Sequence, residues 1–140
     1  MKDAPLITSK NVTLSFMVGG TEVNAVKESS ISIPTGKITI IYGPSGSGKS
    51  SMLNMISGLQ APTSGVFKYQ DAELYSRTPN ELAFFRAHEL GIVYQTNFWV
   101  KSLSVVENVA MPLYFLGKSK EEAKSLAIDA LKRVDMEQYE

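Results

Sequence analysis

The first part of the chain alternates between apolar and polar positions, which is the pattern of half-buried strands. Residues 6–16 alternate through Val12, Leu14 and Phe16. Gly19-Gly20 then marks a turn, and residues 23–26 can return as the second strand of a hairpin. The pattern predicts an antiparallel β segment at the start of the chain.

Four more short runs predict strands. Ser30 to Ile33 alternates as a half-exposed strand, and Pro34-Thr35-Gly36 makes a tight turn after it. Lys37 to Tyr42 is a β-branched and aromatic run, which favours a buried strand. Residues 66–69 predict a short strand, and Gly91 to Tyr94 predicts another buried one.

Elsewhere the apolar residues recur at helical spacing. A first helix is predicted after residue 48 and stops at Gly58, with an apolar set of Met52, Leu53, Met55, Ile56 and Leu59. Capping boxes at Thr78/Glu81, Ser104/Glu107 and Ser119/Glu122 predict three further helix starts.

Details within these helices add three expectations. The helix from Pro79 carries Leu82, Phe84, Phe85 and His88, and we interpret His88 as a surface or satisfied helical residue. Pro112 should kink or end the helix that starts at the Ser104/Glu107 capping box. The last helix places one set of residues on a single apolar face: Ala123, Leu126, Ala127, Ala130, Leu131 and Val134.

Strands that interleave with helices indicate an α/β domain, here with a partly parallel sheet. We expect residues 1–95 to hold the β-rich segment and the core of the domain. Residues 96–140 look mostly helical and form a separate portion.

Composition excludes several classes of protein. The 140 residues include 14 basic and 14 acidic ones, so no broad electrostatic field indicates a nucleic acid or an anionic lipid as partner. The absence of cysteine excludes disulfides and thiolate metal sites. The N-terminus lacks the apolar region of a signal peptide, and no run approaches the ~18 apolar residues of a membrane span. A membrane role therefore requires a partner.

The chain also holds a phosphate-binding motif. Gly43-Pro44-Ser45-Gly46-Ser47-Gly48-Lys49-Ser50 fits the pattern G-x-x-x-x-G-K-[ST], between a predicted strand and a predicted helix. Glycines let successive backbone N–H groups turn around an anion, and the following helix points its positive end there. Lys49 would reach the β- and γ-phosphates, and the Ser50 hydroxyl would complete a Mg²⁺ shell. The alternative is a Gly/Ser-rich turn that matches by chance.

Further motifs come after the loop in a recognisable order: residues 59–65 (LQAPTSG), 91–95 (GIVYQ) and 103–109 (LSVVENV), then Pro112-Leu113. With these motifs the chain, from about residue 6 to 134, resembles the nucleotide-binding subunit of an ABC transporter. It is most similar to the bacterial subgroup that includes the lipoprotein-release and macrolide-export ATPases. The resemblance implies a P-loop NTPase fold of the ABC type, with an N-terminal antiparallel β segment and a helical subdomain.

The resemblance implies roles for particular residues. Phe16 matches the aromatic that stacks on adenine, although by the residues alone it is better explained as a core aromatic. Gln95, otherwise an ordinary polar residue ending a strand, matches the glutamine that contributes to Mg²⁺ and to the attacking water. The implied catalytic residues are Lys49 and Gln95, and the metal ligands are Ser50 and Gln95. The implied residues for binding the cofactors ATP and Mg²⁺ are Phe16, Gly43, Pro44, Ser45, Gly46, Ser47, Gly48, Lys49, Ser50 and Ser51.

The resemblance also implies partners and a location. Residues 96–115 match the region that receives the coupling helix of a membrane subunit; their exposed apolar residues equally fit an ordinary helical lobe. Two nucleotide-binding subunits pair head to tail in this family, each completing the other's ATP site. We expect a cytoplasmic protein, peripheral on the inner face of the cell membrane, that drives transport or extraction and binds no nucleic acid.

The chain departs from the family pattern after its last predicted helix. The L-S-G-G-Q signature, the second acidic motif, the D-loop and the switch histidine do not occur before Glu140, and His88 lies before Gln95. The fold is therefore expected to be incomplete at the C-terminus, with unpaired edges beside the 37–42 strand. We expect this chain alone to bind ATP with negligible turnover.

Two other functions fit parts of the sequence. A guanylate-kinase-type nucleotide kinase also uses a G-P-S-G-x-G-K-S loop, but such kinases normally begin at the loop strand, and here no cluster of arginines marks an acceptor site. A regulatory fragment that binds nucleotide without hydrolysis is the second alternative.

Overall fold

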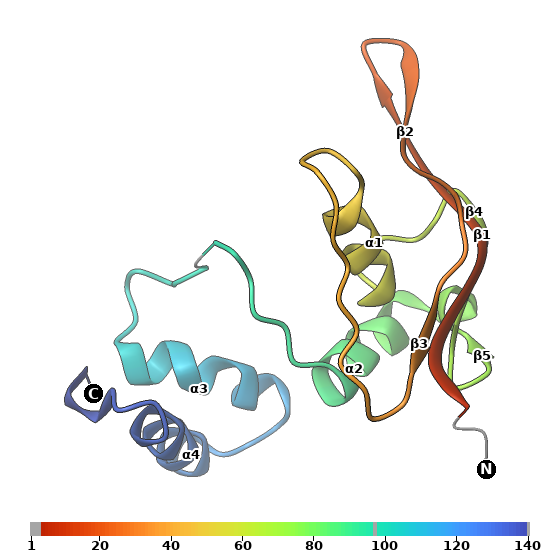
Figure 1. Cartoon of the computed structure of the whole chain (residues 1–140). Coiled ribbons are helices and arrows are strands. Elements are labelled where there is room, and N and C mark those ends of the chain that lie inside the picture. Colours follow the sequence, from red (N-terminus) through yellow and green to blue (C-terminus); the bar gives the residue numbers. More distant parts are fainter. Residues whose placement is uncertain (1–3, 97, 140) are drawn as a thin grey trace. The chain divides into compact units, whose positions relative to one another are not determined.

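The computed structural model describes residues 4–96 and 98–139. One position of the predicted 96–115 region, and the outermost positions of the predicted 1–95 and 96–140 segments, therefore lie outside the described residues. The chain divides into two compact units, Met1–Leu90 and Gly91–Glu140 (Figure 1). Each unit is described by itself below.

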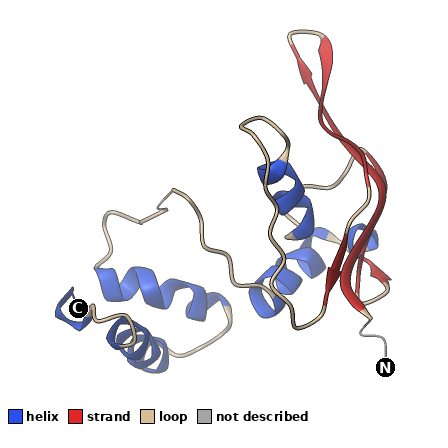
Figure 2. Ribbon diagram, viewed as in Figure 1, coloured by secondary structure: helices blue, strands red, loops and turns tan. Residues whose placement is uncertain are grey.

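The first unit is built on an antiparallel sheet of five strands within the described residues (Figure 2). The order is β2-β1-β4-β5, and β3 also pairs with β1. The partly parallel sheet expected from the sequence is wrong for this part of the chain, because all four strand pairings are antiparallel. The strands are β1 (Pro5–Val18), β2 (Thr21–Ser29), β3 (Ser32–Pro34), β4 (Ser64–Tyr69) and β5 (Ala72–Glu73).

The predicted hairpin is confirmed. β1 and β2 are joined by a turn at Gly19 and Gly20, both of which adopt positive φ, as such a short connection requires. Leu14 pairs with Val26 and Phe16 with Val23. The predicted strand at residues 66–69 is also confirmed as part of β4, which pairs with β1 although the two strands are far apart in the sequence.

Two helices and a short 3-10 turn complete the first unit: α1 (Lys49–Ile56), α2 (Pro79–Glu89) and η1 (Leu74–Ser76). α1 ends as the sequence predicts, because Gly58 has a φ of 69° and the backbone N–H groups of residues 58 and 59 donate to Met55 and Asn54. The buried core draws on strands and helices alike: Ile7, Val12, Leu14, Val26, Met52, Met55, Phe67, Leu74 and Phe85.

Two predicted buried strands do not form. The segment 37–42 is extended but unpaired, and Ile38, Ile40 and Tyr42 are 94%, 76% and 90% exposed. In the second unit the segment 91–94 likewise lacks strand pairing, and Val93 is 100% exposed. Apolar β-branched runs become buried strands only when neighbouring strands satisfy their backbone groups. Among the described residues no strand pairs with either segment, so composition alone predicted the wrong state.

The capping boxes are confirmed at two helices. In α2 the Thr78 hydroxyl accepts from the Glu81 N–H, and the Glu81 carboxylate accepts from the Thr78 N–H. These backbone and side-chain hydrogen bonds from Thr78 lower the pKa of Glu81.

Only part of the apolar set expected in α2 is buried. Phe85 is in the core, whereas Phe84 and His88 are exposed and their rings stack on each other. His88 Nδ1 lies 3.0 Å from the Phe84 carbonyl oxygen.

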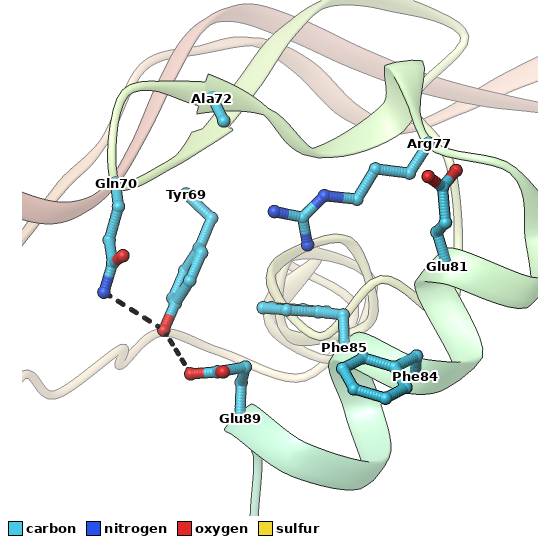
Figure 3. Close-up of a pocket in the computed structure, with 8 residues that line it drawn as sticks. All are labelled: Tyr69, Gln70, Ala72, Arg77, Glu81, Phe84, Phe85 and Glu89. Carbon is cyan, nitrogen blue, oxygen red and sulfur yellow. Dashed lines mark hydrogen bonds between the residues drawn. The ribbon is translucent and has the colours of Figure 1, made fainter.

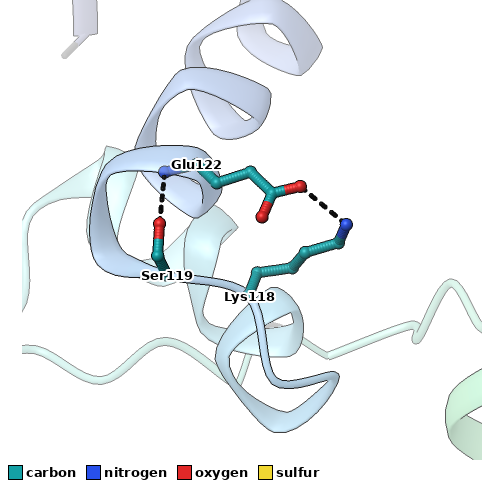
Figure 4. Close-up of polar contacts among 3 residues, drawn as sticks. All are labelled: Lys118, Ser119 and Glu122. Atoms are coloured by element: carbon teal, nitrogen blue, oxygen red, sulfur yellow. Dashed lines mark hydrogen bonds and ion pairs between the residues drawn. The ribbon is translucent and has the colours of Figure 1, made fainter.

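The second unit is a pair of helices, α3 (Val105–Phe115) and α4 (Lys120–Lys132), followed by the short turn η2 (Glu137–Tyr139). α3 begins with the Ser104/Glu107 capping box. At α4 the Ser119 hydroxyl accepts from the Glu122 N–H, and Lys118 forms an ion pair with the Glu122 carboxylate at 2.6 Å (Figure 4). The local sequence therefore determines where both helices start.

The packing of α3 against α4 buries fewer residues of the apolar face of α4 than the sequence predicts. Val106 and Ala110 of α3 are buried together with Ala123, Ala127 and Leu131 of α4. Leu126 and Ala130 are exposed, because a single neighbouring helix covers only the i, i+4, i+8 stripe. Val134 is exposed because α4 ends at Lys132, before this residue. α3 also continues for three residues beyond Pro112 before it ends. The proline lies in the last turns, where few backbone bonds depend on it.

Tyr75 ties the turn η1 to the end of α1, and this contact allows a test of the fold. Its hydroxyl lies 2.6 Å from the carbonyl oxygens of both Met55 and Gln60. We expect Tyr75→Phe to lower the free energy of unfolding by about 1–2 kcal/mol at neutral pH, because both carbonyls lose this partner. Urea unfolding followed by circular dichroism measures the change.

The pH dependence of the same variant provides a second readout. Burial raises the pKa of Tyr75 above its ordinary value of 10.0. A raised pKa means that the native state favours the protonated hydroxyl, so its contribution is complete below about pH 10 and is lost as the pH rises further. The two unfolding free energies should therefore converge above that pH. A difference that stays constant up to pH 11 would contradict this role for Tyr75.

None of the helices in the described part of the chain combines the length and apolarity needed to cross a bilayer.

Candidate phosphate-binding site

The predicted phosphate loop connects the extended segment 37–42 to the N-terminus of α1. Gly46 and Gly48 adopt φ values of +79° and +86°, a backbone conformation that residues with a side chain rarely adopt. α1 begins at Lys49 without a side-chain cap and without an acidic residue in its first turn. The first-turn N–H groups and the positive end of the helix dipole therefore face the loop without a covering carboxylate, which suits an anion.

The loop is seated on strand β2 through Gly48. A Cβ added at Gly48 would lie 2.4 Å from the carbonyl oxygen of Ala25 and 3.2 Å from Val26 Cγ2. Only a glycine allows this close approach of the two backbones. The start of α1 is therefore held against the hairpin, and Met52 and Met55 continue that contact into the core. The sequence carries no signal that would identify Ala25 and Val26 as the seat of the loop.

Lys49 folds back along the loop that precedes it. Its Nζ donates to the carbonyl oxygens of Gly43 at 2.9 Å and Pro44 at 2.7 Å, and it lies 3.4 Å from Ser47 Oγ. The ammonium thus reaches from α1 across the loop to its start. An ammonium has three donors, and the long contact to Ser47 is the weakest of these interactions.

The other predicted loop residues lie around this lysine. Pro44, Ser45, Ser47 and Ser50 are exposed, and Ser51 is half-buried. Ser50, directly after Lys49, therefore presents its hydroxyl in the first turn of α1 on the accessible side. Of the predicted residues from 43 to 51, Gly48, Lys49 and Ser51 are half-buried and the others are exposed.

Phe16 lies on β1 and is 43% exposed, so it is not the core aromatic that the strand pattern alone favoured. Side chains alternate along a strand, so Phe16 is on the same face as Leu14. Leu14 pairs with Val26, the residue beside Gly48. The exposed ring is thus two residues along β1 from the strand pair on which the loop is seated.

Gln95 belongs to the second unit. It is exposed and lies at a bend immediately after the extended segment 91–94.

A cavity of about 430 Å³ lies between β4 and α2 of the first unit, and none of the predicted site residues lines it (Figure 3). The Arg77 guanidinium points into it, 5.1 Å from the Phe85 ring centroid. The Tyr69 hydroxyl donates to the Glu89 carboxylate at 2.9 Å, and burial followed by this hydrogen bond raises the pKa of Tyr69.

Comparison with known proteins was made for the whole chain. The model of the ABC transporter family matches residues 26–140, which include the loop, α1 and both helices of the second unit. The chain belongs to the ABC transporter family and corresponds to its ATP-binding domain. This membership decides against the nucleotide-kinase alternative.

Two of the similar proteins are both named as ATP-binding proteins, and both match nearly the whole chain. The lipoprotein-releasing system ATP-binding protein LolD of Idiomarina loihiensis is 39% identical over 98% of the chain, and the uncharacterized ABC transporter ATP-binding protein YvrO of Bacillus subtilis is 31% identical over 94%. The chain covers 60% and 57% of these two proteins. It therefore spans somewhat less than two thirds of the relatives that it matches.

Solved structures give the same fold. The ATP-binding cassette MJ0796, in a dimeric post-hydrolysis state bound to ADP and Pi, is 34% identical and superimposes with a TM-score of 0.87 over 95% of this chain and 59% of its own. A second dimeric structure of MJ0796, described as a bacterial ABC transporter cassette, matches equally well. The expected fold, an ABC-type ATPase with an antiparallel β segment and helices, is thereby confirmed.

Proposed function

We propose that the loop from Gly43 to Ser51 binds the phosphates of Mg-ATP, and that the protein powers an ABC transporter of the lipoprotein-release type. The observation that carries this proposal is the geometry of the loop: Lys49 spans it, and the uncapped start of α1 faces it. ADP and Pi are bound by the cassette MJ0796, which shares this fold. LolD, among the most similar relatives, is named as an ATP-binding protein of lipoprotein release.

Lys49 binds the β- and γ-phosphates in this proposal. A phosphate oxygen takes the place of Ser47 Oγ, whose distance of 3.4 Å from Nζ marks the weakest of the lysine's contacts. Before the nucleotide binds, the shorter hydrogen bonds to the carbonyl oxygens of Gly43 and Pro44 hold the ammonium at the start of the loop. Lys49 therefore neutralises charge on the phosphates without a large rearrangement.

The residues present fit a magnesium ion that arrives with the nucleotide. Ser50 offers an exposed hydroxyl beside Lys49, and oxygen ligands of this kind suit Mg²⁺. The described residues contain no cluster of His, Asp and Glu that could hold a metal by itself. Such a shell is completed by phosphate oxygens and water, and Gln95 is the second protein ligand that we propose. When bound, the ion would neutralise negative charge on the phosphates.

Residues 96–115 are proposed as the docking region for the coupling helix of a membrane subunit. Within this region the aromatic side chains of Phe98 and Trp99 and the aliphatic ones of Val100 and Leu103 are exposed. Exposed apolar side chains grouped in one loop are typical of a protein interface. A cytoplasmic position on the inner face of the membrane, and head-to-tail pairing with a second nucleotide-binding subunit, complete the proposal.

The 140 residues by themselves are proposed to bind Mg-ATP without efficient hydrolysis. They contain Lys49, Ser50 and Gln95, but neither the second acidic motif, an apolar strand ending in Asp and then Glu, nor the L-S-G-G-Q signature. Hydrolysis requires a positioned water and full stabilisation of the γ-phosphoryl group. Turnover by the isolated chain at the rate of a complete ABC subunit would contradict this part of the proposal.

Calorimetric titration of the chain with Mg-ATP tests the central proposal, with GTP and GMP as competitors. We expect saturable ATP binding at one site per chain, and GMP should not compete because its single phosphate cannot reach Lys49 and Ser50 together. Absence of ATP binding by a chain whose circular dichroism shows it to be folded would overturn the assignment of the loop.

Phe16 provides a separate test of how the base is bound. Phe16→Ala should weaken ATP binding by about tenfold through the loss of ring stacking, while binding of inorganic triphosphate should not change. Met17→Ala is the matched control, because Met17 is exposed on the opposite face of the same strand. Equal losses for ATP and triphosphate would show that Phe16 acts only on the fold.

A further inference from the structure

The side chain of Asn108 is bonded to the loop that precedes its own helix. Its Oδ1 accepts from the Val100 N–H at 2.8 Å, and its Nδ2 lies 3.1 Å from the Val100 carbonyl oxygen. The same Nδ2 lies 3.1 Å from the Leu103 carbonyl oxygen and 2.9 Å from that of Ser104. One half-buried side chain thus contacts the backbone of three loop residues.

The amide of Asn108 acts on Val100 as a neighbouring strand would. It satisfies both the N–H and the C=O of that residue, which otherwise belong to an unpaired segment. The Val100 carbonyl oxygen also accepts from the Leu103 N–H at 3.0 Å and closes a turn. The two amide hydrogens of Asn108 are shared among three carbonyl oxygens, so the turn and the start of α3 are joined at a single point.

Two other contacts restrain this loop at its ends: the Phe98 ring packs edge-to-face on Tyr94, with ring centroids 5.2 Å apart, and Ser104 caps α3. Phe98, Trp99, Val100 and Leu103 are all exposed, so no buried side chain anchors the segment. An exposed segment without a buried anchor samples many conformations, and ordering it on binding costs free energy. Hydrogen bonds from Asn108 remove part of that cost in advance.

We propose that Asn108 is a positioning residue: it holds the 98–104 loop in one conformation and thereby presents its apolar side chains to the membrane subunit. The identity of the partner rests on the proposed function. The restraint of the loop rests only on the contacts within the second unit. The two parts can therefore fail separately.

Trp99 makes the restraint measurable, because it is the single tryptophan of the chain. Asn108→Ala should increase the quenching of Trp99 fluorescence by acrylamide and lower its anisotropy. Exchange of the Val100 amide hydrogen should accelerate by about tenfold, the effect of losing one ordinary hydrogen bond. Alanine is a better helix former than asparagine, so α3 itself should not lose helicity.

Two variants separate the restraint from general destabilisation. Asn108→Asp keeps the acceptor for the Val100 N–H and loses the donors, so Val100 should stay protected while Trp99 gains mobility. Asn80→Ala makes the same truncation at an exposed position in the first turn of α2 and should leave Trp99 unchanged. Unchanged Trp99 quenching and Val100 exchange in Asn108→Ala would overturn the proposal.

The positioning role is tested in the complete ATP-binding subunit with the detergent-solubilised membrane subunit of the same transporter. Asn108→Ala should weaken their association several-fold, whereas calorimetric Mg-ATP binding should be unchanged. Undiminished association despite a mobile Trp99 would overturn the positioning role. If the unmodified protein did not bind ATP, the proposed function would be wrong. The conclusion from Trp99 about the restraint of the loop would still hold.

Discussion

Replacing Lys49 with alanine should abolish measurable Mg-ATP binding. The Lys49 ammonium lies across the loop through its contacts to the carbonyl oxygens of Gly43 and Pro44, and in the proposed function it binds the phosphates. Charge-assisted hydrogen bonds contribute about 1.5–3 kcal/mol each, and Lys49 would make bonds to two phosphates. We therefore expect a loss of affinity of at least about 100-fold, measured by calorimetry.

Two controls accompany this substitution. Lys37→Ala removes the same charge from the exposed start of the 37–42 segment and should leave the affinity for Mg-ATP unchanged. Circular dichroism of the Lys49→Ala variant should match that of the unmodified chain, because among the described residues the hydrogen-bond partners of the Lys49 amino group belong to the loop. An affinity within a few-fold of the original would mean that the loop binds no phosphate.

Gly48→Ala is expected to have the second largest effect, on stability and on ATP binding together. The new methyl group would lie 2.4 Å from the Ala25 carbonyl oxygen, and the backbone would have to hold a φ of +86°. The left-handed conformation alone costs an alanine about 1–2 kcal/mol, and the clash with β2 adds to that. We expect a loss of at least about 2 kcal/mol in the free energy of unfolding, measured with urea.

Gly46→Ala is the matched control for this second prediction. Gly46 lies in the same loop with a φ of +79°, but a Cβ there meets no atom within 4 Å. The substitution should therefore cost only the backbone term of about 1–2 kcal/mol, without a clash. Equal destabilisation by the two substitutions would show that the approach of the loop to Ala25 is not what restricts position 48.

The pair of glycine substitutions also tests how the hairpin contributes to the site. β2 supports Gly48, and β1 carries Phe16 two residues from the paired Leu14. A loop displaced from β2 by the methyl group would lose its alignment with Phe16 as well as its own shape. ATP should then lose more affinity than inorganic triphosphate in Gly48→Ala, which calorimetry with both ligands can measure.

Local features of the fold were predictable from the sequence. The turn at Gly19-Gly20, the capping boxes of α2 and α3 and the end of α1 at Gly58 all form where residue types predict them. Each depends on hydrogen bonds between residues a few positions apart. Such interactions are complete within a short segment, so the rest of the fold hardly changes them.

Burial was predicted less well, because it depends on neighbours that are distant in the sequence. The apolar runs 37–42 and 91–94 have the composition of buried strands, yet they are unpaired and exposed in the described chain. Leu126 likewise belongs to the apolar face of α4 but lies beyond the stripe that α3 covers, and Val134 lies beyond the end of the helix at Lys132. In each case the pattern indicates which residues could be buried, and the available partners decide which are.

By itself the sequence determined the phosphate-loop motif, the positions of turns and caps, and membership of the ABC transporter family, because glycine, lysine and hydroxyl residues at set spacings permit few alternatives. Only the tertiary structure decided that Gly48 rests against Ala25, that β1 pairs with β4, and that the Asn108 amide holds Val100. At least one partner in each of these contacts is a backbone group, and a backbone group is the same in every residue. Their partners therefore leave no pattern in the sequence, and the packing of the folded chain selects them.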